Sequence, residues 1–201
     1  MDANFNTNIF EGELVRLVAE DAKTMAEAFS RWGRDAEFSR LLTSETLALR
    51  SPKPIQEWIE KNREKESDQV FQFMIRTLKG NTLIGDIGLE VFWNHQDSFV
   101  GIGLGERSFW GKGYGTDAMR VMLRFAFGEL NLQRVSLDVF EYNPRAIRSY
   151  EKVGFVFEGR QRQALEREGR RWDMVFMGIL REEWEAKQLG LQTGSKVSQI
   201  R

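Results

Sequence analysis

Two hydrophobic periods meet at a glycine-rich turn in the middle of the chain. Apolar residues alternate over residues 99–104, the period of a β-strand, with Val100, Ile102 and Leu104 on one side. Beyond the turn the spacing is helical, and its apolar residues are Ala118, Val121, Met122 and Phe125. The turn at residues 111–116 therefore joins a predicted strand to a predicted helix.

The same reading predicts alternating strands and helices elsewhere. Further strands are expected at residues 14–18, 71–75, 87–93, 135–139, 155–165 and 172–180, with hairpin turns at Lys79-Gly80-Asn81 and Glu168-Gly169. Helices are expected from Asp21 to Gly33, after Ser51, and from Asn143-Pro144 to Gly154. A helical crossover makes the strand at 135–139 parallel to the one at 99–104. The fold class is thus mixed α/β (α+β), with a mostly antiparallel sheet.

Chain length and composition predict one globular domain. The 201 residues are 41% hydrophobic, which is enough for a sizeable core. We assign this domain to residues 1–189, and the polar, aperiodic residues 190–201 to a C-terminal tail. Residues 34–50 show no clean period, and their apolar side chains Phe38, Leu41, Leu42 and Leu47 either cover a cleft or pack in the core.

The glycine turn has a physical use at the start of a helix. The first helical turn exposes unpaired N–H groups and the positive end of the helix dipole, which suit phosphate. Gly111, Gly113 and Gly115 would let a diphosphate approach the backbone closely. The alternative is a flexible turn that binds nothing. The spacing G-x-G-x-G fits neither a P-loop nor a G-x-G-x-x-G dinucleotide fingerprint.

Composition excludes several classes of chemistry. The chain has no cysteine and a single histidine, His95, so thiol nucleophiles, disulfides and Cys/His metal sites are ruled out. A net charge of −1 gives no general attraction to nucleic acid or to an anionic membrane. Residues 1–8 show no basic region followed by an apolar one. We expect a cytoplasmic protein that needs no metal, nucleic acid or membrane.

Two motifs carry a resemblance to a known family. Residues 110–118 read Trp-Gly-Lys-Gly-Tyr-Gly-Thr-Asp-Ala, and residues 143–155 read Asn-Pro-Arg-Ala-Ile-Arg-Ser-Tyr-Glu-Lys-Val-Gly-Phe. Together they resemble the GNAT superfamily of N-acetyltransferases, and most of all its Rim-type branch of ribosomal-protein N-terminal acetyltransferases, which is similar to spermidine acetyltransferases. The resemblance implies the GNAT fold, in which the two parallel strands splay apart. The family's first motif usually begins with Gln or Arg, where this chain has Trp110.

The resemblance also implies a cofactor and site residues. Acetyl-CoA would place its pyrophosphate on the amides of Gly111, Lys112, Gly113, Tyr114, Gly115 and Thr116, and its pantetheine along the strand edge near Leu104 and Gly105. Asn143 would lie near the pantetheine. Tyr150 would protonate the departing thiolate. Without the resemblance, Asn143 reads as a helix cap and Tyr150 as a core aromatic.

The implied reaction is direct attack of a primary amine on the thioester, with no covalent enzyme intermediate. An alkyl ammonium with a pKa near ~10 needs a base more than an α-amine with a pKa near ~8. Glu106, Asp86 and Glu90 are the candidate bases, with a water relay as an alternative. The amine is a protein N-terminus, a polyamine or another small amine.

Other functions and a second oligomeric state stay open. A catalytically degenerate CoA-binding regulator would bind acetyl-CoA without turnover, and a dinucleotide oxidoreductase would bind NAD(P) instead. Apolar residues of the closing hairpin offer a surface for a homodimer as the alternative to a monomer, namely Phe155, Phe157, Trp172 and Phe176.

Overall fold

The computed structural model describes residues 8–63 and 68–190. The strands found there form one sheet in the order β1-β2-β3-β4-β5-β7-β6. They are β1 Val15–Val18, β2 Val70–Thr77, β3 Leu83–Phe92, β4 Asp97–Leu104, β5 Arg134–Phe140, β6 Val156–Arg167 and β7 Arg170–Leu180. Every neighbouring pair is antiparallel except β4 and β5, which are parallel.

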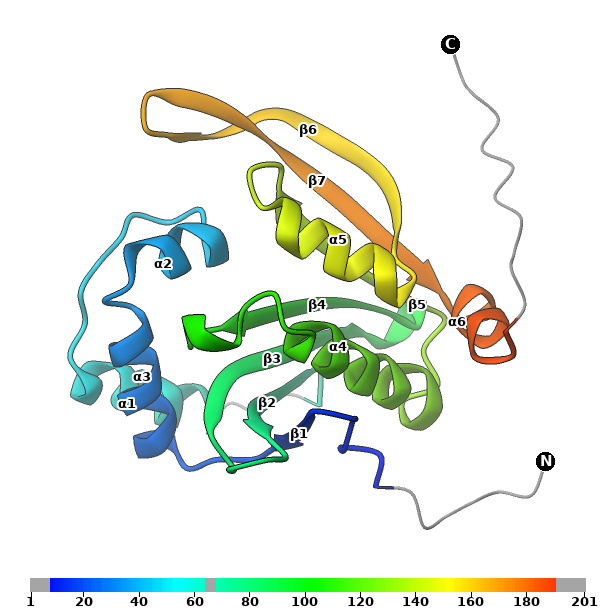
Figure 1. The fold of residues 1–201 in the computed structure, drawn as a ribbon, viewed down its shortest axis with the longest axis horizontal. Coiled ribbons are helices and arrows are strands. Elements are labelled where there is room, and N and C mark those ends of the chain that lie inside the picture. The colour runs from blue at the N-terminus through cyan, green and yellow to red at the C-terminus, as the bar shows by residue number, and fades with distance from the viewer. Residues whose placement is uncertain (1–7, 64–67, 191–201) are drawn as a thin grey trace.

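Helices cover both faces of this sheet. They are α1 Ala22–Trp32, α2 Ala36–Leu42, α3 Pro52–Arg63, α4 Tyr114–Arg124, α5 Pro144–Val153 and α6 Arg181–Gln188. A π-helical turn over Phe125–Glu129 extends α4. In Figure 1, α1, α2 and α3 gather at one end of the molecule, and α4 and α5 lie over the middle of the sheet.

The helices pack on the sheet through two apolar clusters. The larger one packs α4 residues such as Met119 and Met122 against the strand residues that alternate toward them, including Ile87 and Leu137. The smaller one joins α1, α2 and α3 to Met74 of β2. The strand side opposite α4 carries Asp86, Gly88 and Glu90 on β3, as the alternation predicts.

A buried carboxylate ties α4 to the start of the sheet. Asp117 is only 3% exposed, and its carboxylate accepts hydrogen bonds from the backbone N–H groups of Glu13, Leu14 and Val15. A Cβ atom on Gly12 would lie 2.3 Å from Asp117 Oδ2, so only glycine lets the chain wrap this closely. The contact fixes the helix that carries the glycine turn.

The structure confirms the predicted fold class and most predicted elements. Asp21 caps α1 through Thr24 N, Gly33 ends this helix, and α3 starts directly after Ser51. Two helices were not predicted: α2, which lies in the aperiodic residues 34–50, and α6. Residues 191–201 of the predicted tail lie outside the described residues. Within the described ranges, no helix combines the length and apolar character needed to cross a membrane.

Candidate active site

The parallel strands part and leave a cavity between them. β4 and β5 are paired only at Phe99 and Ser136, near the beginning of each strand. Beyond this pair a cavity of about 420 Å³ opens. Its walls come from the apolar side chains of α2, the edge of β4, the glycine turn, the end of β5 and one face of α5.

The glycine turn forms one wall of this cavity with its backbone. Gly113 is the residue before α4 and has φ 92°, and Gly111 has φ 71°, both in the left-handed region that favours glycine. No side chain caps the helix, so the N–H groups of its first turn are available to a ligand. Gly111, Gly113, Gly115 and Thr116 all line the cavity.

Helix α5 forms the opposite wall. Asn143 Oδ1 accepts a hydrogen bond from Ala146 N, which confirms that Asn143 caps the helix, and its side chain also lines the cavity. Burial, assisted by the charge of Asp138, raises the pKa of Tyr150 to about 12. A phenol with this pKa keeps its proton at neutral pH and can donate it. The hydroxyls of Thr116 and Ser149 lie 2.7 Å apart and link α4 to α5.

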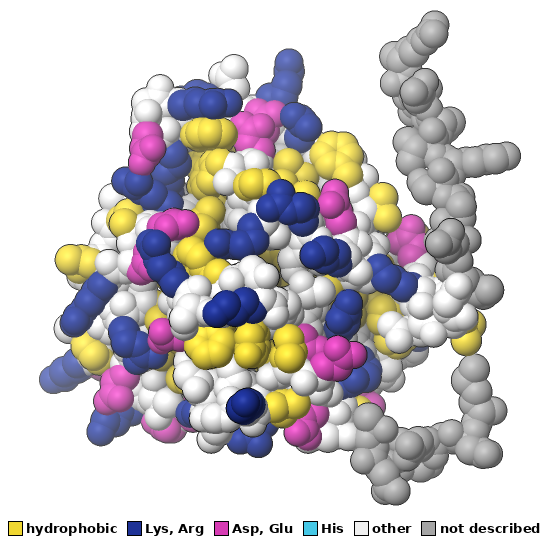
Figure 2. Space-filling model, viewed as in Figure 1, with side chains coloured by type: hydrophobic (Ala, Val, Ile, Leu, Met, Phe, Trp, Pro, Cys, Tyr) yellow, Lys and Arg dark blue, Asp and Glu magenta, His cyan; other side chains and the backbone are white. Residues whose placement is uncertain are grey.

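Cationic side chains from α5 surround the cavity on this side. Arg145, Arg148 and Lys152 belong to its lining. Figure 2 shows Lys and Arg side chains over the region of α5. Such charges complement a phosphate-bearing ligand that enters between α4 and α5.

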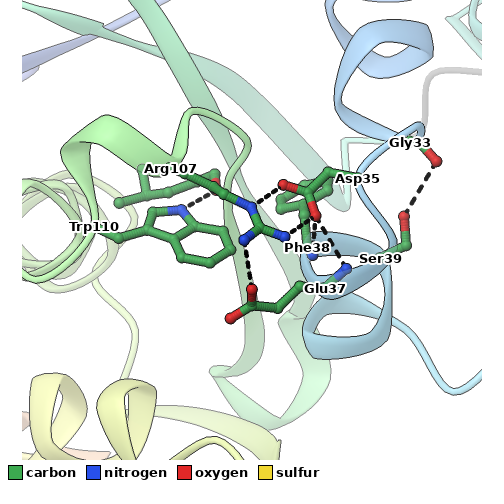
Figure 3. Close-up of polar contacts among 8 residues, drawn as sticks. Gly33, Asp35, Glu37, Phe38, Ser39, Arg107 and Trp110 are labelled. Atoms are coloured by element: carbon green, nitrogen blue, oxygen red, sulfur yellow. Dashed lines mark hydrogen bonds and ion pairs between the residues drawn. The ribbon is translucent and has the colours of Figure 1, made fainter.

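Trp110 lines the cavity, and two arginines lie over its ring. Its indole Nε1 donates a hydrogen bond of 2.6 Å to Leu104 O, and the guanidinium of Arg145 lies 4.0 Å from the ring centroid. Arg107 approaches the same ring and pairs with Asp35 and Glu37 of the α2 region, as Figure 3 shows. This pairing holds α2 beside the cavity.

The predicted base Glu106 points away from the cavity. Its Oε1 accepts hydrogen bonds from Arg31 Nη2 at 2.9 Å and from Trp32 Nε1 at 2.8 Å. Burial alone would raise the pKa of Glu106, but these hydrogen bonds and the Arg31 charge outweigh burial and lower it. A carboxylate with a lowered pKa is a weaker base, and Glu106 is absent from the cavity lining within the described residues.

The other two predicted bases also lie outside the cavity lining. Burial raises the pKa of Asp86 to about 7, which would suit a base. Its Oδ1 lies beside Gly103 of β4, where a Cβ atom would also meet Leu42 and Phe38 of α2, but Asp86 itself is not part of the lining. Glu90 is exposed on the same strand. Neither carboxylate reaches the space between β4 and β5.

Comparison with known proteins decides the family. The family model described as "Acetyltransferase (GNAT) domain" matches residues 13–156. The chain belongs to the GNAT acetyltransferase family. This acetyltransferase has residues of its glycine turn and of α5 in the lining of one cavity.

Individual relatives agree with this placement. The "SPbeta prophage-derived uncharacterized N-acetyltransferase YokL" of Bacillus subtilis (strain 168) is 33% identical over 138 residues, 68% of this chain and 75% of the relative. YdaF of the same organism, whose name proposes a ribosomal N-acetyltransferase, is 35% identical over 82 residues, 41% of this chain and 45% of the relative. The spermidine N-acetyltransferase of Vibrio cholerae, solved with CoA and spermine, has a TM-score of 0.72 at 23% identity and covers 85% of this chain and 96% of its own.

The structure brings together only part of the predicted cofactor site of this acetyltransferase. The predicted residues that line the cavity are Leu104, Gly111, Gly113, Gly115, Thr116, Asn143 and Tyr150. The predicted residues Gly105, Lys112 and Tyr114 do not belong to the lining. Gly105 faces α1, where an added Cβ would lie 2.0 Å from the Trp32 ring, and the Tyr114 ring packs edge-on against Phe109.

The sequence left one feature of the cavity open and missed another. Of the apolar side chains expected either to cover a cleft or to pack in the core, Phe38, Leu41 and Leu42 line the cavity. The missed feature is Asp138, a carboxylate of β5 that belongs to the lining. Asp138 alternates with the buried Leu137 and Val139, so its side chain must lie on the opposite face of the strand. That alternation was the available signal. In the described part of the chain, no group of three or more His, Asp and Glu side chains is placed to hold a metal.

Proposed function

We propose that this protein is an acetyl-CoA-dependent N-acetyltransferase that acts on a primary amine by direct attack. One observation supports this function above the others. The uncapped first turn of α4 and the partly buried phenol of Tyr150 line the same cavity, which opens where two parallel strands have parted. This arrangement offers a site for a diphosphate and a proton donor for a departing thiolate.

The residues present fit acetyl-CoA. The amides at Gly113 and Gly115 are open to a diphosphate, and Arg148 and Lys152 add positive charge nearby. Beyond Phe99, the edge of β4 that faces β5 has no strand partner among the described residues, so it is free to hydrogen-bond an extended pantetheine chain. We place that chain along β4 toward Leu104, whose carbonyl already accepts the Trp110 indole N–H.

The side chains supply proton transfer rather than covalent catalysis. Acetyl-CoA supplies the activated acetyl group when bound. Tyr150 holds a proton at its hydroxyl and gives it to the departing sulfur. Asn143 keeps the first turn of α5 in place through Ala146, and so keeps Tyr150, two turns later, in position. The amine is the nucleophile, so the chain needs no cysteine or serine for this reaction.

The relatives indicate which amines to test first. One relative carries a name that proposes ribosomal substrates, and a structural neighbour was solved with spermine. A panel of peptides, polyamines and other small amines therefore tests the proposal, with thiol release from acetyl-CoA as the readout. Release that depends on an amine supports the transferase. Binding of acetyl-CoA without release would instead support the regulatory alternative.

Replacing Gly113 with valine should weaken acetyl-CoA binding. A side chain at φ 92° strains the turn and blocks the approach of a phosphate to the amides. Loss of one charge-assisted hydrogen bond, worth about 1.5–3 kcal/mol, lowers affinity by ~10- to 100-fold. Calorimetry with acetyl-CoA measures the effect.

A matched control for this variant is Gly80→Val. Gly80 has φ 85° in the turn between β2 and β3 and does not line the cavity, so it carries the same kind of backbone strain away from the site. Its acetyl-CoA affinity should equal that of the parent. Equal affinity in both variants would place the cofactor elsewhere.

The oligomeric state is a separate proposal. Of the four residues predicted for this surface, Phe157 and Phe176 are 53% and 40% exposed, whereas Phe155 is buried in the core at 3% and Trp172 is half-buried. Val156 beside them is 45% exposed, and β6 is an edge strand of the sheet. An exposed apolar edge can pair with a second copy. Light scattering distinguishes a monomer at 23.4 kDa from a homodimer at twice that mass.

A further inference from the structure

Asp138 lies directly across the opening from Gly101. The last pair of the parallel ladder is Phe99 with Ser136, and two residues further along each strand come Gly101 and Asp138. Side chains two apart on a strand share a face, so Asp138 lies on the face opposite α4, where Phe99 and Gly101 also lie. A Cβ atom on Gly101 would have no neighbour within 4 Å, so the space next to it is open.

Asp138 is the one carboxylate among the described residues that line the cavity. It is close enough to Tyr150 that its charge raises the pKa of that phenol. Within the described ranges no side chain donates a hydrogen bond to it, whereas Asp117 and Glu106 are both occupied by protein donors. A carboxylate without a protein donor, beside the proposed acid, is available to a ligand.

The rest of this side of the cavity is apolar. The lining there comes from Phe38, Leu41 and Leu42 of α2, with Phe99 of β4 and Phe140 of β5. The cationic members of the lining, Arg145, Arg148 and Lys152, all come from α5 on the other side. The apolar wall and Asp138 therefore form one compartment, opposite the region that suits phosphate.

The apolar wall is tied to the hairpin across the cavity. Arg167 Nη2 donates to Thr43 O at 2.9 Å and to Glu45 O at 3.0 Å, and Arg40 pairs with Glu168. Tyr142 Oη also donates to Arg40 O. In Figure 1 the tip of β6 and β7 extends toward α2. The segment after α1 is thus held in place at several points.

We propose that Asp138 binds the ammonium group of the acceptor and takes its proton, and that this compartment accepts a monoamine on an apolar body. The inference rests on the proposed function and names its substrate class. A diamine or polyamine would bring a second ammonium among Phe and Leu side chains. That charge would be buried without a partner, which is costly.

The proposed step balances as follows. The Asp138 carboxylate takes one proton from the ammonium, and the amine nitrogen uses the freed electron pair to form a bond to the acetyl carbonyl carbon. The carbon–sulfur bond then breaks, and the sulfur takes the proton of the Tyr150 hydroxyl. The new amide nitrogen loses its extra proton, which restores Tyr150, and Asp138 releases its own proton to water. The products are an acetamide, CoA thiol and one proton.

The first test replaces Asp138 with asparagine, which keeps the size and removes the charge. We expect kcat/KM for hexylamine to fall by ~10²-fold or more, with the acetyl-CoA affinity unchanged. Asp97→Asn is the control, because Asp97 lies on the same face of neighbouring β4 but outside the cavity lining. The control should match the parent.

A pH profile separates this role from a structural one. The acidic limb of kcat/KM that requires a deprotonated Asp138 should be present in the parent and in Asp97→Asn and absent in Asp138→Asn. The other ionisable groups among the described residues of the lining are Tyr150, Arg145, Arg148 and Lys152 of α5. Asp86 of β3, whose pKa burial raises to about 7, lies outside the lining beside Gly103, where Phe38 and Leu42 also lie. Asp86→Asn is therefore measured as well and should keep the acidic limb. An unchanged limb in Asp138→Asn would overturn the assignment.

The second test uses the unaltered protein and two amines of equal length. Hexylamine should exceed 1,6-diaminohexane in kcat/KM by about tenfold or more, because only one ammonium has a partner. Equal or better use of the diamine would overturn the monoamine inference. If neither these amines nor the wider panel release thiol, the proposed function itself fails. If the parent turns over and Asp138→Asn is equally active, only the role of Asp138 is rejected.

Discussion

Replacing Tyr150 with phenylalanine should slow acetyl transfer and leave acetyl-CoA binding nearly intact. The ring keeps its place on α5 against Phe155, 6.0 Å away between centroids, so packing survives the loss of one hydroxyl. What disappears is the proton donor for the departing thiolate, an interaction that strengthens as the carbon–sulfur bond breaks. General acid catalysis is worth ~10²- to 10⁴-fold. We expect the lower part of that range, because a weakly basic thiolate can leave unaided.

Single-turnover kinetics measure this effect free of product release. The pKa of Tyr150, raised to about 12 mainly by burial, keeps the phenol protonated through the neutral and mildly alkaline range. The parent should therefore show no loss of activity from Tyr150 ionisation until pH approaches that value. Parental rates in Tyr150→Phe would return the residue to a packing role. A large loss of acetyl-CoA affinity would assign the hydroxyl to holding the thioester before reaction.

Replacing Asp117 with alanine should have the largest effect on stability. The variant leaves three backbone N–H groups without an acceptor, a buried one at Val15 and two part-buried ones at Glu13 and Leu14. An unsatisfied buried donor costs about 1–3 kcal/mol, so a loss of about 3 kcal/mol in the free energy of unfolding is expected. Urea unfolding followed by circular dichroism measures it.

Asp21→Asn is the control for this stability prediction. Asp21 caps α1 through Thr24 N, and asparagine serves as well as aspartate at an N-cap. Its urea midpoint should stay at the parental value. An equally small shift in Asp117→Ala would mean that water replaces the carboxylate and that the contact does not hold α4 to the sheet.

The fold was largely predictable because its strands and long helices bury one face each. The exception, α2, has seven residues and buries only Phe38. Its stability comes from Asp35, which caps it and pairs with Arg107, 72 positions away. Local periodicity carries no information about such a partner. Similarly, no α6 residue is buried, and Arg181 at its start bonds to Phe127 O and Leu132 O across the chain.

The same distinction between local sequence and distant partners holds for the candidate site. The glycine turn and the α5 motif are each an unbroken run of sequence, so the sequence could indicate both of them, Tyr150 included. From the sequence, Glu106 was a candidate base because its hydrogen-bond donors, Arg31 and Trp32, are 75 and 74 positions away in the chain. Asp138 was not singled out from the sequence, because its importance depends on where β4 and β5 part. The point where the two strands part is set by tertiary packing, and the alternation of side chains along a strand carries no information about it.

The most direct test of the central claim is transfer of an isotopically labelled acetyl group from acetyl-CoA to an amine, followed by mass spectrometry of the amine. We predict that the parent protein produces labelled acetamide and free CoA thiol in equal amounts, and only when both acetyl-CoA and an amine are present. Thiol release without a labelled amine, or tight acetyl-CoA binding with no transfer to any amine in the panel, would contradict the account.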